Sequence, residues 1–190
     1  APKVSIVVPI YNLEKYVPRC LDALVNQTLE DIEILCVNDG SKDSAPQIIE
    51  DYKKRYPNKV KTFHKENGGE WSARTYGLKQ ATGEYVGFID SDDVPEVTWA
   101  EKLYNAAKKN DADIAFSGYD RVDLDTGNVV STEMTQHGTM NKEVDWNDDF
   151  IVYANPSLWN KLYRRELVKD LEFLPSRGCN DTVFLIHSHM

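Results

Sequence analysis

The run Lys3–Pro9, in which residues 4–9 read VSIVVP, decides the fold of this chain. It is a continuous, mostly β-branched stretch, which is typical of a central parallel strand buried on both faces. Three further strand-sized runs follow at Ile32–Val37, Val60–His64 and Tyr85–Ile89. Because segments with helical spacing separate these runs, the sequence predicts a parallel α/β sheet whose faces are covered by helices.

The segments between the strands carry the expected helices. Their apolar residues recur at helical spacing, and asparagine, glycine or proline marks several of their ends. The expected helices are Leu13–Gln27 with Asn12 as its cap, Ala45–Arg55, Trp71–Gln80 and Val97–Lys109.

The pattern changes after a fifth expected strand at Ile114–Ser117. Tyr119–Glu133 is expected to form a hairpin, because residues 125–128 read Asp-Thr-Gly-Asn, a favourable turn sequence. Leu162–Leu167 is a further candidate strand, and a candidate helix begins at Asp181. Without a linker or an internal repeat, we expect a single domain with a Rossmann-type mixed, mostly parallel sheet flanked by helices.

The composition excludes several function classes. The chain has 190 residues, the size of one ordinary domain, with 31 acidic and 22 basic side chains and a net charge of −9. No nucleic-acid partner is expected, because clustered Lys and Arg are what holds a phosphate backbone. No apolar run approaches the roughly 20 residues of a membrane span. The 3 widely spaced cysteines predict neither a disulfide framework nor a zinc site. A cytoplasmic location is therefore expected, with the inner face of the membrane as an alternative.

Polar residues gather where each of the first four expected strands ends. Tyr11 and Asn12 follow the first strand, Asn38–Ser41 the second, Glu66–Gly69 the third and Asp90–Asp93 the fourth. In parallel α/β sheets, ligands bind beyond the carboxyl ends of the strands. This end of the sheet is therefore the predicted site.

The sequence Asp90-Ser91-Asp92-Asp93 is the sharpest chemical signal. Its three carboxylates repel one another unless a cation lies among them, and oxygen ligands favour Mg²⁺ or Mn²⁺. If the chain stays extended there, Asp90 and Asp92 face the same side and can bind one ion. The alternative is a solvated acidic turn before the next helix. The position directly after a buried strand, opposite a second acidic turn at Asp39, favours the metal site.

Asp39 and Arg74 are the other candidate binding residues. Asp39 can accept a hydrogen bond from a base or ribose, although Asp is also an ordinary turn residue. Arg74 can clamp a diphosphate, or it is a surface arginine on an amphipathic helix. Trp71 and Trp159 can stack on a sugar or lie in the core, and Lys161 can neutralise phosphate charge.

Five segments together resemble the inverting nucleotide-sugar glycosyltransferases of family 2, whose fold is called GT-A. They are VSIVVPIYN (Val4–Asn12), VNDGSKD (Val37–Asp43), ENGGEWSARTYG (Glu66–Gly77), GEYVGFIDSDD (Gly83–Asp93) and WNKLYRREL (Trp159–Leu167). The resemblance covers nearly the whole chain. It implies a GT-A domain over residues 1–190, with a nucleotide-sugar-binding half at 1–118. Residues 119–190 would be the acceptor-side half, which is expected to be truncated at its C-terminus.

The resemblance also implies roles for single residues. Asp90 and Asp92 would form the metal-binding DXD motif, with Asp92 the closest ligand of Mg²⁺ or Mn²⁺. The implied nucleotide-sugar-binding residues are Pro9, Tyr11, Asn12, Asp39, Arg74, Asp90 and Ser91, of which Pro9, Tyr11 and Asp39 would line the nucleoside pocket.

Two positions depart from the family pattern. Asn38 stands where the family often has an aspartate, and Asn180 stands where a glutamate usually precedes the catalytic aspartate. Asp181 matches the position of that aspartate and is the candidate catalytic base. The alternative for Asp181 is a carboxylate at a helix N-terminus, where the helix dipole favours it.

These residues predict a metal-dependent inverting glycosyltransferase. An acceptor hydroxyl would attack the anomeric carbon of a nucleoside-diphosphate sugar, and Asp181 would take the hydroxyl proton. A metal held by Asp90 and Asp92 would stabilise the leaving diphosphate. The expected acceptor is a carbohydrate or a lipid-linked glycan, in the synthesis of bacterial cell-surface polysaccharide. Peripheral membrane association and a homodimer stay open.

Three other functions compete with this one. A catalytically inactive nucleotide-sugar-binding module is favoured by Asn180. A nucleotidyltransferase would normally carry a glycine-rich loop after the first strand, and residues 10–13 contain no glycine. A phosphatase with an aspartyl nucleophile would want a Gly-Thr-like continuation after its acidic motif, whereas Val94 and Pro95 follow here.

Overall fold

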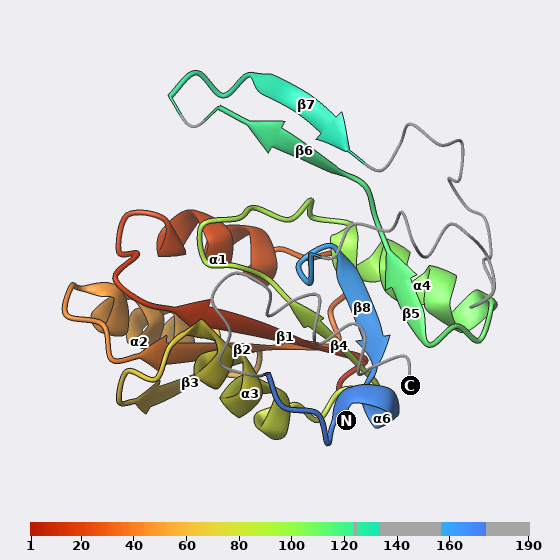
Figure 1. The fold of residues 1–190 in the computed structure, drawn as a ribbon, viewed down its shortest axis with the longest axis horizontal. Helices are drawn as coiled ribbons and strands as arrows, with labels where there is room; N and C mark the ends of the chain where they lie inside the picture. The colour runs from red at the N-terminus through yellow and green to blue at the C-terminus, as the bar shows by residue number, and fades with distance from the viewer. Residues whose placement is uncertain (124, 134–156, 174–190) are drawn as a thin grey trace.

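A six-stranded sheet in the order β3-β2-β1-β4-β8-β5 forms the centre of the molecule (Figure 1). The structure is a computed structural model, and it describes residues 1–123, 125–133 and 157–173. The strands are β1 (Val4–Ile10), β2 (Ile32–Asp39), β3 (Val60–Lys65), β4 (Tyr85–Phe88), β5 (Ile114–Phe116) and β8 (Lys161–Arg164). Strands β1 to β4 pair in parallel, and β8 lies antiparallel between β4 and β5. The predicted mixed, mostly parallel α/β sheet in a single domain is confirmed.

Helices cover both faces of the sheet, and the central strand shows why. Val4, Ile6 and Val8 of β1 belong to one core cluster, whereas Val7 belongs to a second cluster on the opposite face. A strand buried on both faces needs apolar residues at consecutive positions. Helices α1 (Val17–Val25), α2 (Ala45–Arg55) and α4 (Trp99–Lys109) contribute to the first cluster, and α3 (Glu70–Gln80) and α6 (Arg165–Val168) to the second.

Two predicted boundaries differ from the observed ones by more than two residues. The first helix begins at Val17 rather than Leu13, with Pro18 in its first turn, where a missing N–H leaves nothing unpaired. Asn12 is therefore not its cap. The strand predicted to end at Leu167 ends at Arg164 and continues directly into α6, because its partners β4 and β5 are only 4 and 3 residues long.

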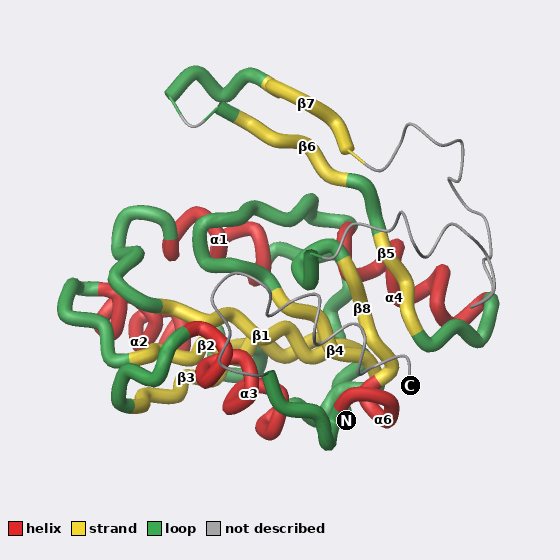
Figure 2. The backbone as a smooth tube through the Cα atoms, viewed as in Figure 1, coloured by secondary structure: helices red, strands yellow, loops and turns green. Residues whose placement is uncertain are grey.

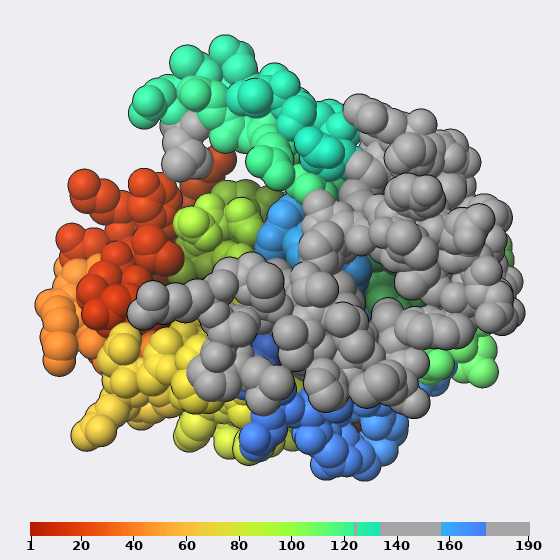
Figure 3. All heavy atoms as spheres, in the orientation of Figure 1, coloured from red at the N-terminus to blue at the C-terminus, as the bar shows by residue number. Residues whose placement is uncertain are grey.

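The hairpin predicted from the Asp-Thr-Gly-Asn turn is confirmed. Strands β6 (Tyr119–Val122) and β7 (Val129–Glu133) pair antiparallel as a separate two-stranded sheet. In Figure 3 this hairpin stands away from the six-stranded body, at the top of the view. The candidate helix that begins at Asp181 lies outside the described residues. In the part of the chain that the structure describes, no helix is long and apolar enough to cross a membrane.

The parallel strands place the predicted site. β1, β2, β3 and β4 all end on the left-hand side of Figure 2, where the loops that follow them emerge. The strand order reverses between β1 and β4, since the chain proceeds from β1 to β2 and β3 on one side and returns to β4 on the other. In open α/β sheets the crevice at such a reversal is the usual position of a ligand.

Candidate functional site

Strands β1 and β4 separate at the end of the sheet that carries the site. Their pairing ends at Val7 and Phe88, and a last bond joins Ile89 N to Val7 O at 3.0 Å. Pro9 lies just beyond this point, buried, with β2 as its remaining neighbour. Proline has no N–H to donate, so it is tolerated where a strand has lost one of its partners. Pro9 therefore marks the place where β1 no longer pairs with β4, at the reversal of the strand order.

The loops after β1 and β2 are joined by hydrogen bonds. Asn12 N donates to Ser41 Oγ at 3.1 Å, and Lys42 N donates to Asn12 Oδ1 at 2.7 Å. Asn12 has a φ of +53°, a left-handed conformation that asparagine tolerates better than most residues. The side chain of Tyr11, next to it, is 48% exposed. The two loops thus form one unit that leaves Tyr11 in contact with solvent.

Asp39 holds the glycine-rich loop before α3. Its Oδ1 accepts from Lys65 Nζ at 2.6 Å and from Gly68 N at 3.0 Å, and its Oδ2 accepts from Gly69 N at 2.8 Å. Gly69 has a φ of +90°, which favours glycine over any residue with a Cβ. The carboxylate is almost fully buried, at 2% exposed. Its burial is balanced by one full positive charge and two backbone donors.

Arg74 connects α3 to the end of β4. Its Nη2 donates to Asp90 Oδ1 at 2.8 Å and lies 2.5 Å from Glu70 Oε1, one helical turn earlier. The guanidinium is buried, and the ring of Phe173 lies 6.0 Å away. Arg74 is therefore a buried site residue rather than the surface arginine of an amphipathic helix. Helix α3 links two predicted residues: its start is fixed by Asp39, and Arg74 fixes Asp90.

The acidic motif after β4 forms a turn. Asp93 N donates to Asp90 O at 2.9 Å, so the chain does not stay extended, and simple alternation does not place Asp90 beside Asp92. Ser91 is buried at 2% exposed, and its Oγ has no hydrogen-bond partner among the described residues. Asp92 is exposed at the tip of the turn. Burial raises the pKa of Asp93 to about 7, and the negative charges of Asp90 and Asp92 add to this shift.

This turn carries oxygen ligands of the kind that a hard divalent cation prefers. Burial is the main cause of the raised pKa of Asp93, and the negative charges of Asp90 and Asp92 add to it, so the three carboxyl groups lie near one another. In the described ranges there is no group of three or more His, Cys, Asp or Glu side chains placed to hold a metal. The candidate protein ligands are Asp92 and the second oxygen of Asp90. Mg²⁺ commonly binds through one or two carboxylates, with substrate phosphates and water as its other ligands.

Three other predicted residues have packing roles in the structure. Lys161 is buried, and its Nζ donates to Asn160 Oδ1 at 2.8 Å and to the carbonyl oxygen of Ser157. Trp159 packs edge-on against Tyr119 with 4.4 Å between ring centroids, and Trp71 packs against the second core cluster. The predicted base Asp181 and its neighbour Asn180 lie outside the described residues.

Two charged residues of the site were missed by the sequence interpretation. Glu70 could have been found from its i, i+4 spacing to Arg74 within one helix. Lys65 is the cross-strand partner of Asp39, a relation that only the β2–β3 register reveals. The sequence shows both as charged residues, but it does not show which oppositely charged side chain each one contacts.

Comparisons with known proteins identify the family of the chain. The family described as "Glycosyl transferase family 2" matches residues 5–172. The "Uncharacterized glycosyltransferase EpsJ" of Bacillus subtilis (strain 168) is 37% identical over 180 residues, which are 91% of this chain and 51% of EpsJ. A "Poly(ribitol-phosphate) beta-glucosyltransferase" of Bacillus spizizenii is 36% identical over 195 residues, covering 99% of this chain and 30% of that protein.

Solved structures show the same fold. TarS 1-349 of S. aureus in complex with UDP superposes with a TM-score of 0.78 at 29% identity, over 98% of this chain and 55% of that chain. Its complex with UDP-GlcNAc gives a TM-score of 0.77 at 28% identity, over 98% of this chain and 53% of that chain. The chain thus spans about half the length of EpsJ and of TarS 1-349.

Proposed function

The chain belongs to glycosyl transferase family 2, and we propose that it is the donor-binding part of a metal-dependent, inverting glycosyltransferase. The observation that carries the proposal is the acidic turn at Asp90–Asp93. It lies where the strand order reverses, and Arg74 ties it to the helix that Asp39 anchors. The named glycosyltransferases among its relatives support the reaction class.

We assign the donor side to residues 1–118. Pro9, Tyr11, Asn12 and Asp39 would contact the nucleoside, since they follow β1 and β2 on the near side of the reversal. Arg74, Asp90 and Ser91 would contact the diphosphate or the sugar on the β4 side. TarS has been solved with UDP and with UDP-GlcNAc, so a uridine diphosphate sugar is the first donor to test.

The chemistry divides between charge stabilisation and proton removal. Mg²⁺ or Mn²⁺, when bound at Asp92 and Asp90, would supply positive charge next to the leaving diphosphate. Arg74 would orient Asp90 for this role through a charge-assisted hydrogen bond. Asp181, in residues 119–190, would accept the proton of the attacking hydroxyl. A single displacement inverts the anomeric configuration without a covalent intermediate.

The acceptor we propose is a carbohydrate or a lipid-linked glycan of the bacterial cell surface. The relative named "Poly(ribitol-phosphate) beta-glucosyltransferase" transfers, by its name, glucose to poly(ribitol-phosphate). Residues 119–190 would supply part of the acceptor side. Peripheral membrane association and a homodimer stay predictions of the sequence.

The test compares donor binding with turnover. The protein is titrated calorimetrically with UDP-GlcNAc, UDP-glucose and GDP-mannose, with Mn²⁺ and with EDTA, and hydrolysis of each donor is followed by nucleotide release. We expect binding of one donor that is lost in EDTA. Failure of all three to bind in Mn²⁺ would contradict the proposal.

A substitution of the proposed base separates an enzyme from an inactive binding module. Asp181→Asn is expected to lower donor hydrolysis by at least about 100-fold and to leave the Kd of the donor within about twofold, because a base acts on the proton and not on the donor. Asn180→Asp is the matched control, since it adds a carboxylate next to the base without removing one. Full activity of Asp181→Asn would dismiss Asp181 as the base, and donor binding without turnover in the unsubstituted protein would favour the inactive module.

A further inference from the structure

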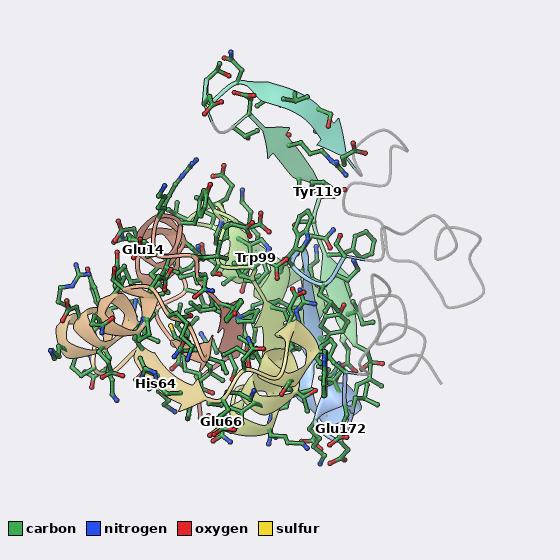
Figure 4. All side chains as sticks on the ribbon, turned by 60° about the vertical axis from the view of Figure 1, so that its left-hand side comes forward. Glu14, His64, Glu66, Trp99, Tyr119 and Glu172 are labelled. Carbon is green, nitrogen blue, oxygen red and sulfur yellow. The ribbon has the colours of Figure 1, made fainter. Side chains whose placement is uncertain are left out.

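A chain of hydrogen bonds runs from α2 through the outer strand β3 into the loops of the site. Asn38 and His64 are cross-strand partners, and Asn38 Nδ2 lies 3.2 Å from His64 Nδ1. On the other side of the ring, His64 Nε2 lies 3.0 Å from Glu50 Oε1 of α2. Figure 4 labels His64 at the edge of the sheet, beside this helix. Neither His64 nor Glu50 belongs to the site described above.

The backbone N–H of Ser41 determines which group donates and which accepts in each of these hydrogen bonds. Its N–H can only donate, and it donates to Asn38 Oδ1 at 3.0 Å. The amide of Asn38 must therefore present its NH₂ group to His64, so His64 Nδ1 accepts. The ring is then neutral, and its single proton lies on Nε2, from which it is donated to Glu50.

This series of hydrogen bonds ends in the two loops whose residues are proposed to contact the nucleoside. Asn38 closes the turn that holds Asp39, as asparagine does through its side-chain oxygen in many turns. Ser41 Oγ then accepts from Asn12 N at 3.1 Å, which fixes the loop after β1. The contacts thus connect His64 to Asp39 through Asn38, and to Asn12 through Asn38 and Ser41.

We propose that His64 is a positioning residue for donor binding, which holds the Asn38–Ser41 turn in shape only while its imidazole is neutral. The inference rests on the proposed function, since the turn matters because it carries Asp39. When Nδ1 takes up a proton, it and Asn38 Nδ2 become two donors that face each other. If Asn38 rotates its amide to accept from the ring, Ser41 N–H loses its acceptor. Donor affinity therefore falls as the pH decreases through the range in which imidazole gains its charge.

Glu50 is the acceptor on one side of the ring. Hydrogen bonds from Thr62 and then His64 lower the pKa of Glu50, so it stays an acceptor. The other charged groups near the ring come from α2: Lys53, whose Nζ lies 3.8 Å from Glu50 Oε2, and Asp51 and Lys54, which line a cavity of about 420 Å³ together with His64.

The remaining titratable neighbour is Cys36 of β2, two residues before Asn38. Burial raises the pKa of its thiol to about 12, so it stays neutral throughout. The side chain of His64 is 44% exposed, so the ring is in contact with solvent in the folded protein.

The first experiment tests the turn without any donor. Amide hydrogen exchange of Ser41 is measured by NMR at pH 8 and at pH 5.5 in the unsubstituted protein, in H64L and in H64N. The side-chain oxygen of asparagine can take the place of Nδ1 as acceptor, but asparagine does not titrate. Relative to H64N at the same pH, we expect Ser41 to exchange about three- to tenfold faster in H64L at both pH values, and in the unsubstituted protein only at pH 5.5. Equal exchange of Ser41 in all three proteins would overturn the proposed effect of His64 on the turn, whatever affinity is measured for the nucleotide sugar.

The second experiment measures the Kd of UDP-GlcNAc and UDP-glucose with Mn²⁺ at the same two pH values. The ratio of each Kd to that of H64N cancels the titration of the site carboxylates. For the unsubstituted protein we expect a ratio near one at pH 8 and about three to ten at pH 5.5, and for H64L the higher ratio at both. N38D is expected to keep its affinity at pH 5.5, because a carboxylate accepts from a protonated ring. A ratio that does not change with pH would contradict the proposal, whereas failure of every protein to bind either donor at pH 8 would contradict the proposed function instead.

Discussion

Glu33 and Asp93, which lie at opposite ends of the parallel sheet, differ in how the chain compensates their negative charge. At the amino end of β2, Glu33 is 3% exposed and accepts from Ser5 Oγ at 2.6 Å, from Lys61 Nζ at 2.6 Å and from both N and Oγ1 of Thr82 at 2.8 Å. Burial opposes the charge of Glu33, but these donors outweigh it and lower its pKa. At the carboxyl end of β4, burial and two neighbouring carboxylates raise the pKa of Asp93 to about 7.

We interpret this difference as one between stability and the proposed function. At the amino end the chain supplies every donor that the buried acid needs, so the ionised form stabilises the fold. At the carboxyl end the chain leaves carboxylates crowded and Ser91 Oγ without a partner among the described residues. Polar groups that stay unsatisfied in a folded protein cost stability, and they persist where a ligand completes them. The comparison therefore predicts that substitutions at the two ends affect different measurements.

The largest expected effect is the loss of donor binding on removal of Asp92. Asp92→Ala is expected to weaken Mn²⁺-dependent donor binding or hydrolysis by at least about 100-fold, because it removes an exposed carboxylate ligand next to the developing diphosphate charge. The free energy of unfolding is expected to change by no more than about 0.5 kcal/mol. Calorimetric titration and urea unfolding measure the two quantities.

The matched control for this substitution is Asp31→Ala, which removes an equally exposed carboxylate at the amino end of β2. Donor binding is expected to stay unchanged in that variant. An Asp92→Ala protein with the same metal titration curve as the unsubstituted protein would remove the metal role from this turn. Equal losses in the two variants would instead point to a general effect of net charge.

The next effect is on stability, at the other end of the sheet. Glu33→Gln is expected to lower the free energy of unfolding by about 2 kcal/mol at pH 7, since it turns charge-assisted hydrogen bonds into weaker neutral ones. The pKa of Glu33 is lower in the folded state, so its contribution is present above its ordinary value of 4.5 and is lost as the pH falls through the lowered value. Urea unfolding at pH 7 and pH 3 should therefore show a difference that shrinks in acid.

Donor binding serves as the second readout for Glu33→Gln, and it is expected to stay unchanged at pH 7. Glu30→Gln, at an exposed position in the same segment, is the control for the loss of one negative charge. A pH-independent loss of stability would mean that Glu33 acts through its shape and not through its charge.

The sequence alone predicted the first four strands of the sheet, but not how its last two strands pair. The β-branched run in β1 and the alternation with helices determine the first four parallel strands, because each must bury both faces. The place of β8 between β4 and β5 depends on contacts 40 or more residues apart in the chain, such as Ser117 with Asn160. No local pattern contains that pairing. The start of the first helix was misplaced, because Pro18 and the hydrogen bond from Lys42 N to Asn12 Oδ1 override the apolar spacing.

The site was predicted as a set of positions rather than as a set of contacts. Motif position placed Asp39, Arg74 and Asp90 at one end of the sheet, since parallel strands bring their carboxyl ends together. The sequence did not show that Arg74 pairs with Asp90, or that Lys65 neutralises Asp39. Such pairs depend on register and on side-chain direction, which motif spacing does not fix.

The smallest expected effect is also the most direct test of the difference between the two ends. Replacement of serine by alanine should change the free energy of unfolding in opposite directions at the two ends. Ser91→Ala removes a buried hydroxyl that has no partner in the described ranges, so it is expected to raise the free energy of unfolding by about 1 kcal/mol and to weaken donor binding. Ser5→Ala removes a buried hydroxyl that donates to Glu33 and accepts from Gly83 N at 2.8 Å, so it is expected to lower the free energy of unfolding by about 1 kcal/mol without changing donor binding. Urea unfolding of both variants without donor measures the signs. If both substitutions destabilise the protein equally, Ser91 Oγ forms hydrogen bonds in the folded protein as Ser5 Oγ does. The Ser91 hydroxyl is then not left unpaired for a ligand.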